Sequence, residues 1–316
     1  MHSDLEIHIA NSAGTCFGVE AAIRIAESVR KPILGPLVHN PKIVGDLAAQ
    51  GIEIMDRYPE LNEIVHHPEV VITAHGYPKP VKEALKDQGV IFHDATCPVL
   101  LKWVYRKIEK FTEEGYNIIL VGNPEHAEII ASRSYGKDIH VVYSIDDADL
   151  LPNNLGKVVA ICQTTITREK FDELVNYIRK TKYPMLRAID TRCKPVKNQQ
   201  LGVEELAQYV DCMLIVGGFN SSNTTSLANI ARKYLPQKTF HIDRPEMIQD
   251  AWLRGTKILG IGAGTSTPKS QITQVIDKIL QMYPGKVFIP DNWKSTSLVS
   301  LEEAEKLSQE DVTEEI

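Results

Sequence analysis

The sequence contains no long hydrophobic run and no excess of positive charge. The longest uncharged stretch of the 316 residues begins at Cys212 and is interrupted by the polar residues 220–226, unlike a transmembrane helix. The first six residues lack the basic region and apolar stretch of a signal peptide. With 35 Lys and Arg against 41 Asp and Glu, the net charge of −6 argues against an extensive duplex-binding surface. We therefore expect a cytoplasmic protein that binds neither a membrane nor nucleic acid.

Cysteine is also scarce. Five cysteines in a chain of this length do not make a disulfide framework, and the sequence lacks the paired Cys-x-x-Cys motifs of most structural zinc sites. What is present is ordinary for a globular protein with a large core, with 43% hydrophobic and 24% charged residues. The cysteines are therefore buried fillers, metal ligands or reactive thiols.

One pattern occurs three times along the chain. Cys16, Cys97 and Cys193 are separated by 81 and 96 residues, a spacing closer to a domain than to a solenoid repeat. Each cysteine follows a short apolar segment and precedes an amphipathic pattern with the helical period of 3.6 residues. Further apolar segments, polar loops and helical patterns then follow in the same order after each cysteine. Residues 52–55 are one of these apolar segments and are predicted to form a strand.

Continuous Val and Ile runs that alternate with helical patterns predict mostly parallel sheets covered by helices. We expect an α/β protein with three similar lobes, residues 1–88, 89–185 and 186–290. Residues 291–316 are rich in acids and are predicted to form a helix or a mobile tail. Pro98 is expected in the first turn of the helix that follows Cys97, where its missing N–H is not needed.

The polar loops lie at the carboxyl ends of the predicted strands, where α/β sheets bind ligands. If the lobes pack around a threefold axis, these loops meet at one cavity. Cys162 and Cys212 lie inside apolar strands and are expected to be core residues. The three repeated cysteines stand between a strand and a helix, where a thiolate is favoured and a soft metal can bind. A [4Fe–4S] cluster on three thiolates would leave one iron open to substrate, whereas zinc would usually take a fourth protein ligand.

Histidine and hydroxyl side chains occupy the other loops. His39, His75 and His126 are in equivalent loops of the first two lobes, and we interpret them as anion-binding rather than metal-binding residues. The matching loops of the third lobe carry the hydroxyl and amide groups of Ser221, Ser222, Asn223 and Ser266. Together with helix N-termini, these groups are typical of a phosphate or diphosphate site.

Glu128 lies two residues after His126. It is either an ordinary acid in the first turn of a helix or, inside a closed cavity, a group that holds and relays a proton. Thr164, in the equivalent position of another loop, offers a hydroxyl for the same relay.

At these positions the sequence resembles the 4-hydroxy-3-methylbut-2-enyl diphosphate reductase family, which performs the last step of the methylerythritol phosphate route to isoprenoids. The resemblance covers nearly the whole chain up to the acidic tail. It rests on Val38-His39-Asn40, Ala74-His75-Gly76, Asp94-Ala95-Thr96-Cys97-Pro98, Gln163-Thr164-Thr165, Asn220-Ser221-Ser222-Asn223 and Ala263-Gly264-x-Ser266-x-Pro268.

The resemblance implies a trefoil of three α/β lobes around a [4Fe–4S] cluster on Cys16, Cys97 and Cys193. It implies that the substrate diphosphate lies among His39, His75, His126, Ser221, Ser222, Asn223 and Ser266. It also implies that Glu128 supplies protons, with help from His126, while Thr164 orients the hydroxyl that leaves as water. The expected products are isopentenyl and dimethylallyl diphosphate, and the expected electron donor is a ferredoxin or a flavodoxin.

The sequence departs from the usual family pattern near two of the cysteines. Residues 13–19 read Ala-Gly-Thr-Cys-Phe-Gly-Val where Arg-Gly-Phe-Cys-x-Gly-Val is usual, and residues 194–200 replace an Ala-Thr…Arg-Gln stretch. The usual His-Pro-Glu is His126-Ala127-Glu128. The expected cluster ligands and proton carrier are all present.

Three other functions are compatible with the residues. One is a [4Fe–4S] lyase or dehydratase that resembles quinolinate synthase, although its dicarboxylate substrates favour arginine or tyrosine in the cavity loops. Another is a related reductase for a different allylic diphosphate. The third is a non-enzymatic scaffold that binds zinc or senses phosphate.

Overall fold

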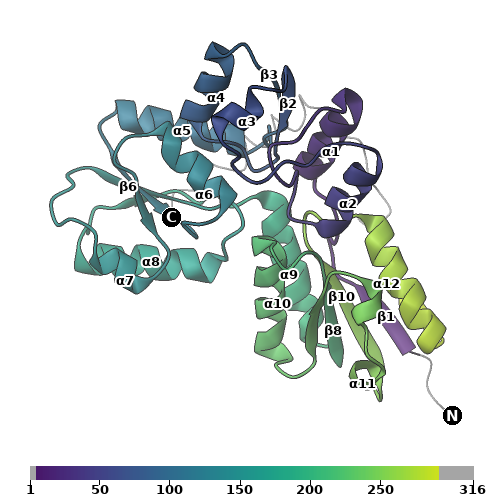
Figure 1. Ribbon diagram of the computed structural model, residues 1–316. Helices are drawn as coiled ribbons and strands as arrows, with labels where there is room; N and C mark the ends of the chain where they lie inside the picture. Colours follow the sequence, from purple (N-terminus) through teal and green to yellow (C-terminus); the bar gives the residue numbers. More distant parts are fainter. Residues whose placement is uncertain (1–4, 292–316) are drawn as a thin grey trace. The chain divides into compact units, whose positions relative to one another are not determined.

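The computed structural model describes residues 5–291, whose strands pair in parallel and form three sheets (Figure 1). In this part of the chain, the contacts define two compact units. The first unit comprises residues 5–19, 39–46 and 194–291, and the second comprises residues 20–38 and 47–193. Two helices, α1 (Phe17–Val29) and α2 (Pro41–Ala49), begin in the first unit and end in the second.

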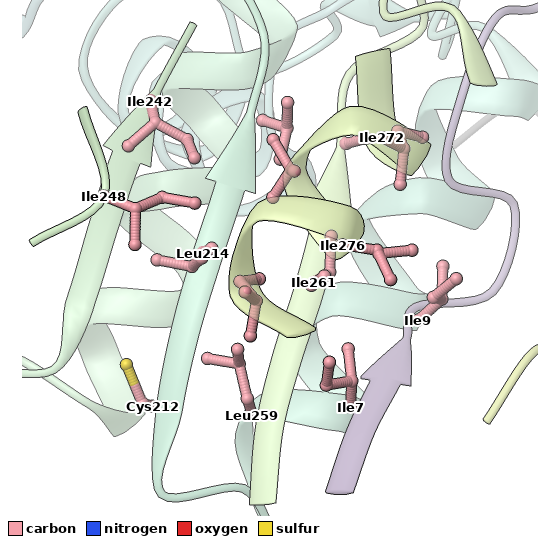
Figure 2. Close-up of a cluster of buried hydrophobic side chains, with 14 of the residues drawn as sticks. Ile7, Ile9, Cys212, Leu214, Ile242, Ile248, Leu259, Ile261, Ile272 and Ile276 are labelled. Carbon is pink, nitrogen blue, oxygen red and sulfur yellow. The ribbon is translucent and has the colours of Figure 1, made fainter. Parts of the chain in front are cut away.

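The first unit contains a five-stranded sheet with helices on both faces. Its strands lie in the order β11 (Gly285–Phe288), β1 (Leu5–Ile9), β10 (Ile258–Ala263), β8 (Cys212–Val216) and β9 (Thr239–Ile242). One face is covered by α12 (Lys269–Met282) and by the short α11 (Asp250–Leu253), and Figure 2 shows Ile272 and Ile276 of α12 beside the strand residues. The other face is covered by α9 (Lys194–Ala207) and α10 (Ser222–Tyr234).

The two covered faces explain why β8 is apolar at every position. Leu214 and Val216 belong to the cluster that includes α12, whereas Met213 and Ile215 belong to the cluster that includes α9 and α10. Successive side chains of a strand point to opposite faces, so a sheet buried on both faces needs a continuous apolar run.

The second unit contains a four-stranded and a two-stranded sheet. The larger sheet has the order β5 (His140–Val142), β4 (Asn117–Val121), β6 (Val158–Cys162) and β7 (Arg187–Ala188). Its faces pack against α5 (Leu101–Glu113) with α6 (Ala127–Ser132) and against α7 (Ile145–Asp149) with α8 (Arg168–Thr181). The smaller sheet pairs β2 (Glu69–Ile72) with β3 (Ile91–Asp94) and packs with α3 (Leu61–Ile64) and α4 (Lys79–Asp87).

The strand that precedes each repeated cysteine pairs with a strand of a different predicted lobe. The strand β1 pairs with β10, β3 with β2, and β7 with β6. At each cysteine the chain therefore leaves a sheet that contains strands of two predicted lobes and continues into a helix. The division into lobes at residues 88, 185 and 290 stays a prediction.

Two local expectations were wrong. The apolar residues 52–55 do not form a strand; Ile54 makes only an isolated bridge with Ile33, whose own extended segment is too short to extend the pairing. The helix after Cys97 begins at Leu101 and not at Pro98, because residues 98–100 form a turn in which the Lys102 N–H reaches back to the Cys97 carbonyl at 3.3 Å.

Two further expectations concern the chain end and the membrane. The predicted helix or tail at residues 291–316 lies outside the described residues except for Asp291. Between residues 5 and 291, every helix is too short or too polar to cross a bilayer.

Candidate functional site

The three repeated cysteines make the same backbone hydrogen bond. In each case the cysteine N–H donates to the carbonyl of the second residue after the end of the neighbouring strand. The three bonds are Cys16 N to Thr265 O (3.0 Å, after β10), Cys97 N to Ala74 O (3.1 Å, after β2) and Cys193 N to Thr164 O (2.9 Å, after β6). The equivalence predicted from the sequence spacing therefore exists in the backbone of each sheet.

The three repeated cysteines differ from the other two in solvent exposure, as expected if only the repeated thiols bind a metal cluster. Cys16, Cys97 and Cys193 are partly exposed, whereas Cys162 and Cys212 are buried inside strands. Burial raises the pKa of Cys162 to about 12 and that of Cys212 to about 11. The expectation that these two are core residues is confirmed, because a neutral buried thiol behaves as a small hydrophobic group.

In the first unit, Asn223 connects the loop of Cys16 with the start of α10. Its amide nitrogen donates to Gln199 Oε1 at 2.8 Å, and the Gln199 amide nitrogen donates to the carbonyls of Ser12 and Gly14 at 2.8 Å each. Both side chains are about 2% exposed. The Oδ1 atom of Asn223 is buried without a hydrogen-bond partner among the described residues, which leaves an acceptor for a bound group.

His39 and Ser266 also lie together in this unit. The Ser266 hydroxyl donates to the His39 carbonyl at 3.4 Å, and both residues are buried. The next residue, Asn40, donates its amide to Gln271 of α12 at 3.0 Å, and its Oδ1 accepts the Lys42 N–H at 2.9 Å at the start of α2. The loop that carries His39 is therefore held by hydrogen bonds at His39 itself and at Asn40.

Ser221 and Ser222 form the beginning of α10. Ser221 is the N-cap, and its Oγ accepts the Thr224 N–H at 3.3 Å, while Ser222 is the first helical residue. Gly264 permits the close approach of this helix to β10, because a Cβ at that position would lie 2.2 Å from the Thr224 hydroxyl. The N-terminus of this 13-residue helix is thus packed beside the Ser266 loop, in the arrangement expected for an anion site.

In the second unit, Glu128 is held by Thr164. The Thr164 N–H donates to Oε1 at 2.6 Å and its hydroxyl donates to Oε2 at 2.7 Å, and Glu128 is only 4% exposed. Burial raises the pKa of Glu128 to about 7 from its ordinary value of 4.5, even though both bonds from Thr164 favour the carboxylate. A carboxyl group with this pKa can both hold and give up a proton near neutral pH.

His126 is the N-cap of α6, the helix that carries Glu128. Its Nδ1 accepts the Glu128 N–H at 3.3 Å, so the ring proton of the neutral form is on Nε2. The ring of His75 lies edge-on to it, with 5.7 Å between the centroids. His75, His126 and Glu128 therefore lie next to one another in the second unit.

Sequence reasoning missed the glutamines. Gln199 links Asn223 to the Cys16 loop, and Gln163 precedes Thr164 and accepts the Asn123 N–H on its Oε1 at 3.0 Å. Gln163 belongs to a quoted motif, but Gln199 lies within α9, where a polar residue is usually solvated. Its near-complete burial is the signal, and it is visible only in the structure.

The predicted residues fall into two sets, one in each unit. The first unit holds Cys16, His39, Ser221, Ser222, Asn223 and Ser266, and the second holds His75, Cys97, His126, Glu128, Thr164 and Cys193. Among residues 5–291, no group of three or more His, Cys, Asp or Glu side chains is assembled as a metal site. The three partly exposed cysteines nevertheless fit an iron–sulfur cluster by their chemistry, because they are thiols in loops with equivalent backbone hydrogen bonds.

Comparison with known proteins gives a consistent result. The family model of the LytB protein matches residues 7–280. A 4-hydroxy-3-methylbut-2-enyl diphosphate reductase of Caldanaerobacter subterraneus subsp. tengcongensis is 35% identical over 283 residues, which are 87% of this chain and 96% of that protein.

Two solved structures are similar as well. The structure of an (E)-4-hydroxy-3-methyl-but-2-enyl diphosphate reductase, the terminal enzyme of the non-mevalonate pathway, is 35% identical, with a TM-score of 0.61 and coverage of 88% of this chain and 99% of that one. The reductase structure from Plasmodium falciparum is 20% identical, with a TM-score of 0.84 and coverage of 98% and 99%, and shows the shared fold. These similarities confirm the predicted resemblance, and the chain belongs to the LytB family.

Proposed function

We propose that this protein is an oxidoreductase that removes the hydroxyl group of 4-hydroxy-3-methylbut-2-enyl diphosphate. In this reaction two electrons and two protons enter, the carbon–oxygen bond breaks, and water leaves. One proton goes to the departing oxygen and the other to carbon, which gives isopentenyl or dimethylallyl diphosphate. The observation that carries the proposal is the buried Glu128 carboxyl, held by both donors of Thr164, in a member of the LytB family.

Cys16, Cys97 and Cys193 are the proposed ligands of one [4Fe–4S] cluster. Such a cluster supplies electrons and, with only three protein ligands, one iron that can act as a Lewis acid. The support is their equivalent backbone bonding and their exposure, in contrast to the buried Cys162 and Cys212.

The proposed diphosphate ligands are His39, His75, His126, Ser221, Ser222, Asn223 and Ser266. The start of α10 supplies N–H groups and hydroxyls, which suit phosphate oxygens. His126 accepts a backbone N–H on Nδ1 and carries its ring proton on Nε2, and an imidazole N–H is a suitable donor to an anion. Serine and asparagine orient such a ligand without adding charge, and a protonated histidine adds charge.

Glu128 is the proposed proton source for the leaving hydroxyl. In the protonated state it can donate to an oxygen next to Thr164, and the Thr164 hydroxyl then stabilises the carboxylate that remains. The raised pKa of Glu128 means that an appreciable fraction is protonated at neutral pH. His126 fixes the start of α6 and hence the position of Glu128.

We propose a ferredoxin or a flavodoxin as the electron donor, because both deliver single electrons at low potential. We also place the enzyme in the cytoplasm, where its thiols, none of which forms a disulfide in the described residues, would stay reduced.

The test is an assay of protein purified without oxygen, with a strong reductant. Three compounds are offered: 4-hydroxy-3-methylbut-2-enyl diphosphate, another allylic diphosphate and a dicarboxylate. Formation of the two five-carbon diphosphates from the hydroxylated substrate supports the proposal. Turnover of only another allylic diphosphate would make the enzyme a related reductase, and tight binding of a dicarboxylate alone would favour the lyase that resembles quinolinate synthase. Iron and sulfide at about four each per chain support the cluster, whereas zinc alone would indicate a scaffold.

A further inference from the structure

The loops before Cys97 and Cys193 share a second feature besides the cysteine backbone bond. An aspartate stands three residues before each cysteine, and in both cases its Oδ1 accepts the backbone N–H two residues further on. Thr96 N donates to Asp94 Oδ1 at 3.0 Å, and Arg192 N donates to Asp190 Oδ1 at 2.9 Å. Each aspartate side chain thus closes a local turn just before the cysteine.

Each of the two aspartates also has a cation of its own. The Lys82 Nζ donates to Asp94 Oδ2 at 2.9 Å, and these side chains are 14% and 24% exposed. Burial raises the pKa of Asp94, but Lys82, the Thr96 N–H and a second lysine, Lys102, whose Nζ lies 3.8 Å from Oδ2, outweigh it, so this pKa lies below its usual value.

The second pair is more deeply buried. The Arg192 guanidinium forms a fork with Asp190, with Nε to Oδ1 at 2.9 Å and Nη2 to Oδ2 at 2.7 Å, and the side chains are only 6% and 4% exposed. A buried ion pair contributes little net stability, because the loss of hydration offsets the attraction. Stability therefore does not explain why this ion pair lies directly before Cys193, with Arg192 as the preceding residue.

The turns connect directly to the bonds that hold the cysteines. Between Asp190 and Cys193, the Thr191 hydroxyl accepts the Cys162 N–H at 2.9 Å, and Cys193 N then donates to Thr164 O at 2.9 Å. In the other loop, Ala95 N donates to Ile72 O at 3.2 Å before Cys97 N reaches Ala74 O. The aspartate turn therefore sets the path of the only two residues that separate each aspartate from its cysteine.

The first cysteine has a different brace. Ala13 stands three residues before Cys16, and the loop is held instead by Gln199, whose amide donates to the Ser12 and Gly14 carbonyls at 2.8 Å. The aspartate device is thus specific to the two cysteines of the second unit.

We propose that Asp94 and Asp190 are positioning residues for Cys97 and Cys193, each closing the turn that presents the thiol to the cluster while a dedicated cation neutralises its charge. This inference rests on the proposed function for the identity of the bound group. It predicts that the acceptor oxygen, and not the negative charge, is the essential property, because the charge is already compensated.

The experiment compares alanine and asparagine at each position, in the full chain purified without oxygen. Asp94→Ala removes the acceptor, whereas Asp94→Asn keeps Oδ1 and removes the charge. For the buried pair, the double variants Asp190→Asn/Arg192→Met and Asp190→Ala/Arg192→Met are compared, because neither leaves the buried guanidinium without its carboxylate. Asp147→Ala is the matched control, because Asp147 also accepts backbone N–H groups, from Tyr143 and Ser144, at the start of α7.

Two readouts are measured. The first is amide hydrogen exchange at Cys97 and Cys193, which reports the turn whether or not a cluster is bound. The second is the rate of iron release to a chelator, together with the electron paramagnetic resonance spectrum of the reduced protein. Loss of a residue that orients a metal ligand typically costs about 10- to 100-fold in metal affinity, so we expect iron release to accelerate by about that factor in the alanine variants.

We expect the asparagine variants and Asp147→Ala to behave like the wild type in both readouts. Alanine variants with wild-type exchange and wild-type iron release would overturn the inference, and so would asparagine variants as defective as alanine. A wild-type chain that binds no iron would instead refute the proposed function, while the exchange data would still decide whether the aspartates order the two turns.

Discussion

Thr164 uses all of its backbone and side-chain polar groups to connect Glu128 with Cys193. Its N–H and hydroxyl donate to the two carboxylate oxygens of Glu128, and its carbonyl accepts the Cys193 N–H. The proposed proton source and one proposed cluster ligand are therefore fixed to the same residue. Because hydrogen bonds of 2.6 to 2.9 Å leave little freedom, the separation between carboxyl and thiol is set by one short segment of backbone.

Replacement of Glu128 by glutamine should remove proton transfer and keep the site otherwise intact. The amide can still accept one of the two bonds from Thr164, and its size is nearly unchanged. We expect kcat to fall by about 100- to 10,000-fold, the usual contribution of a general acid, with little change in iron content or in the Kd for substrate. Single-turnover kinetics and titration calorimetry measure these quantities.

The control for this variant is Glu125→Gln, which changes an exposed glutamate in the loop just before α6. It should leave turnover unchanged. If Glu128→Gln instead lost substrate binding and turnover together, Glu128 would have a structural role.

The stability of the protein should depend on pH through Glu128. Its pKa is raised from 4.5 to about 7 by folding, so the native state favours the protonated form. The free energy of unfolding should therefore decrease as the pH rises from 4.5 to about 7, with a limiting slope of about 1.4 kcal/mol per pH unit from this group. Two other titratable residues interact with Glu128, namely His126, whose ring accepts its N–H, and Tyr105.

Urea titrations at several pH values measure this dependence. In Glu128→Gln this decrease in the free energy of unfolding between pH 4.5 and about 7 should be absent, because the amide does not titrate. The same decrease in both proteins would assign the pH dependence to other groups. In the wild-type enzyme, kcat should fall above about pH 7 as the proton is lost.

Much of the site could be predicted because its residues follow strand ends in a repeated order. Helical and strand periods place Cys16, Cys97 and Cys193 at strand–helix junctions, and the structure confirms this with three equivalent hydrogen bonds. Glu128 and Thr164 were also paired from the sequence. These predictions succeed because loop position at a parallel sheet depends on local patterns.

The strand partners could not be predicted. A strand that is apolar on both faces, such as β1, shows that it is buried between layers, but not which strand lies beside it. The sequence order suggests a partner within the same repeat, whereas β1 pairs with β10, more than 200 residues away. Gln199 was missed for a related reason, since its burial depends on contacts with residues of other elements.

Serine in place of Cys97 should abolish the cluster. A serine hydroxyl is a much harder and less acidic ligand than a thiol, and iron–sulfur clusters depend on thiolates. We expect iron and sulfide to fall from about four each per chain to a small fraction, with loss of visible colour and of sensitivity to oxygen. Cys212→Ala is the control, because Cys212 lies in the core of the first unit and should affect stability but not iron content. Retention of colour by Cys97→Ser would remove Cys97 from the ligand set.

A negative charge at the start of α10 should raise the stability of the protein and lower its affinity for diphosphate. Ser222→Asp places a carboxylate in the first turn of a helix that has no acid there, and this should stabilise the helix by about 0.3–1 kcal/mol. If the diphosphate binds at the same N-terminus, the two like charges repel each other at a cost of several kcal/mol, so affinity should fall by at least about tenfold. Ser222→Asn is the matched control, because it has the shape of aspartate without the charge. Thermal unfolding and equilibrium binding of inorganic diphosphate measure the two effects, and equal affinity of the aspartate and asparagine variants would show that the diphosphate binds elsewhere.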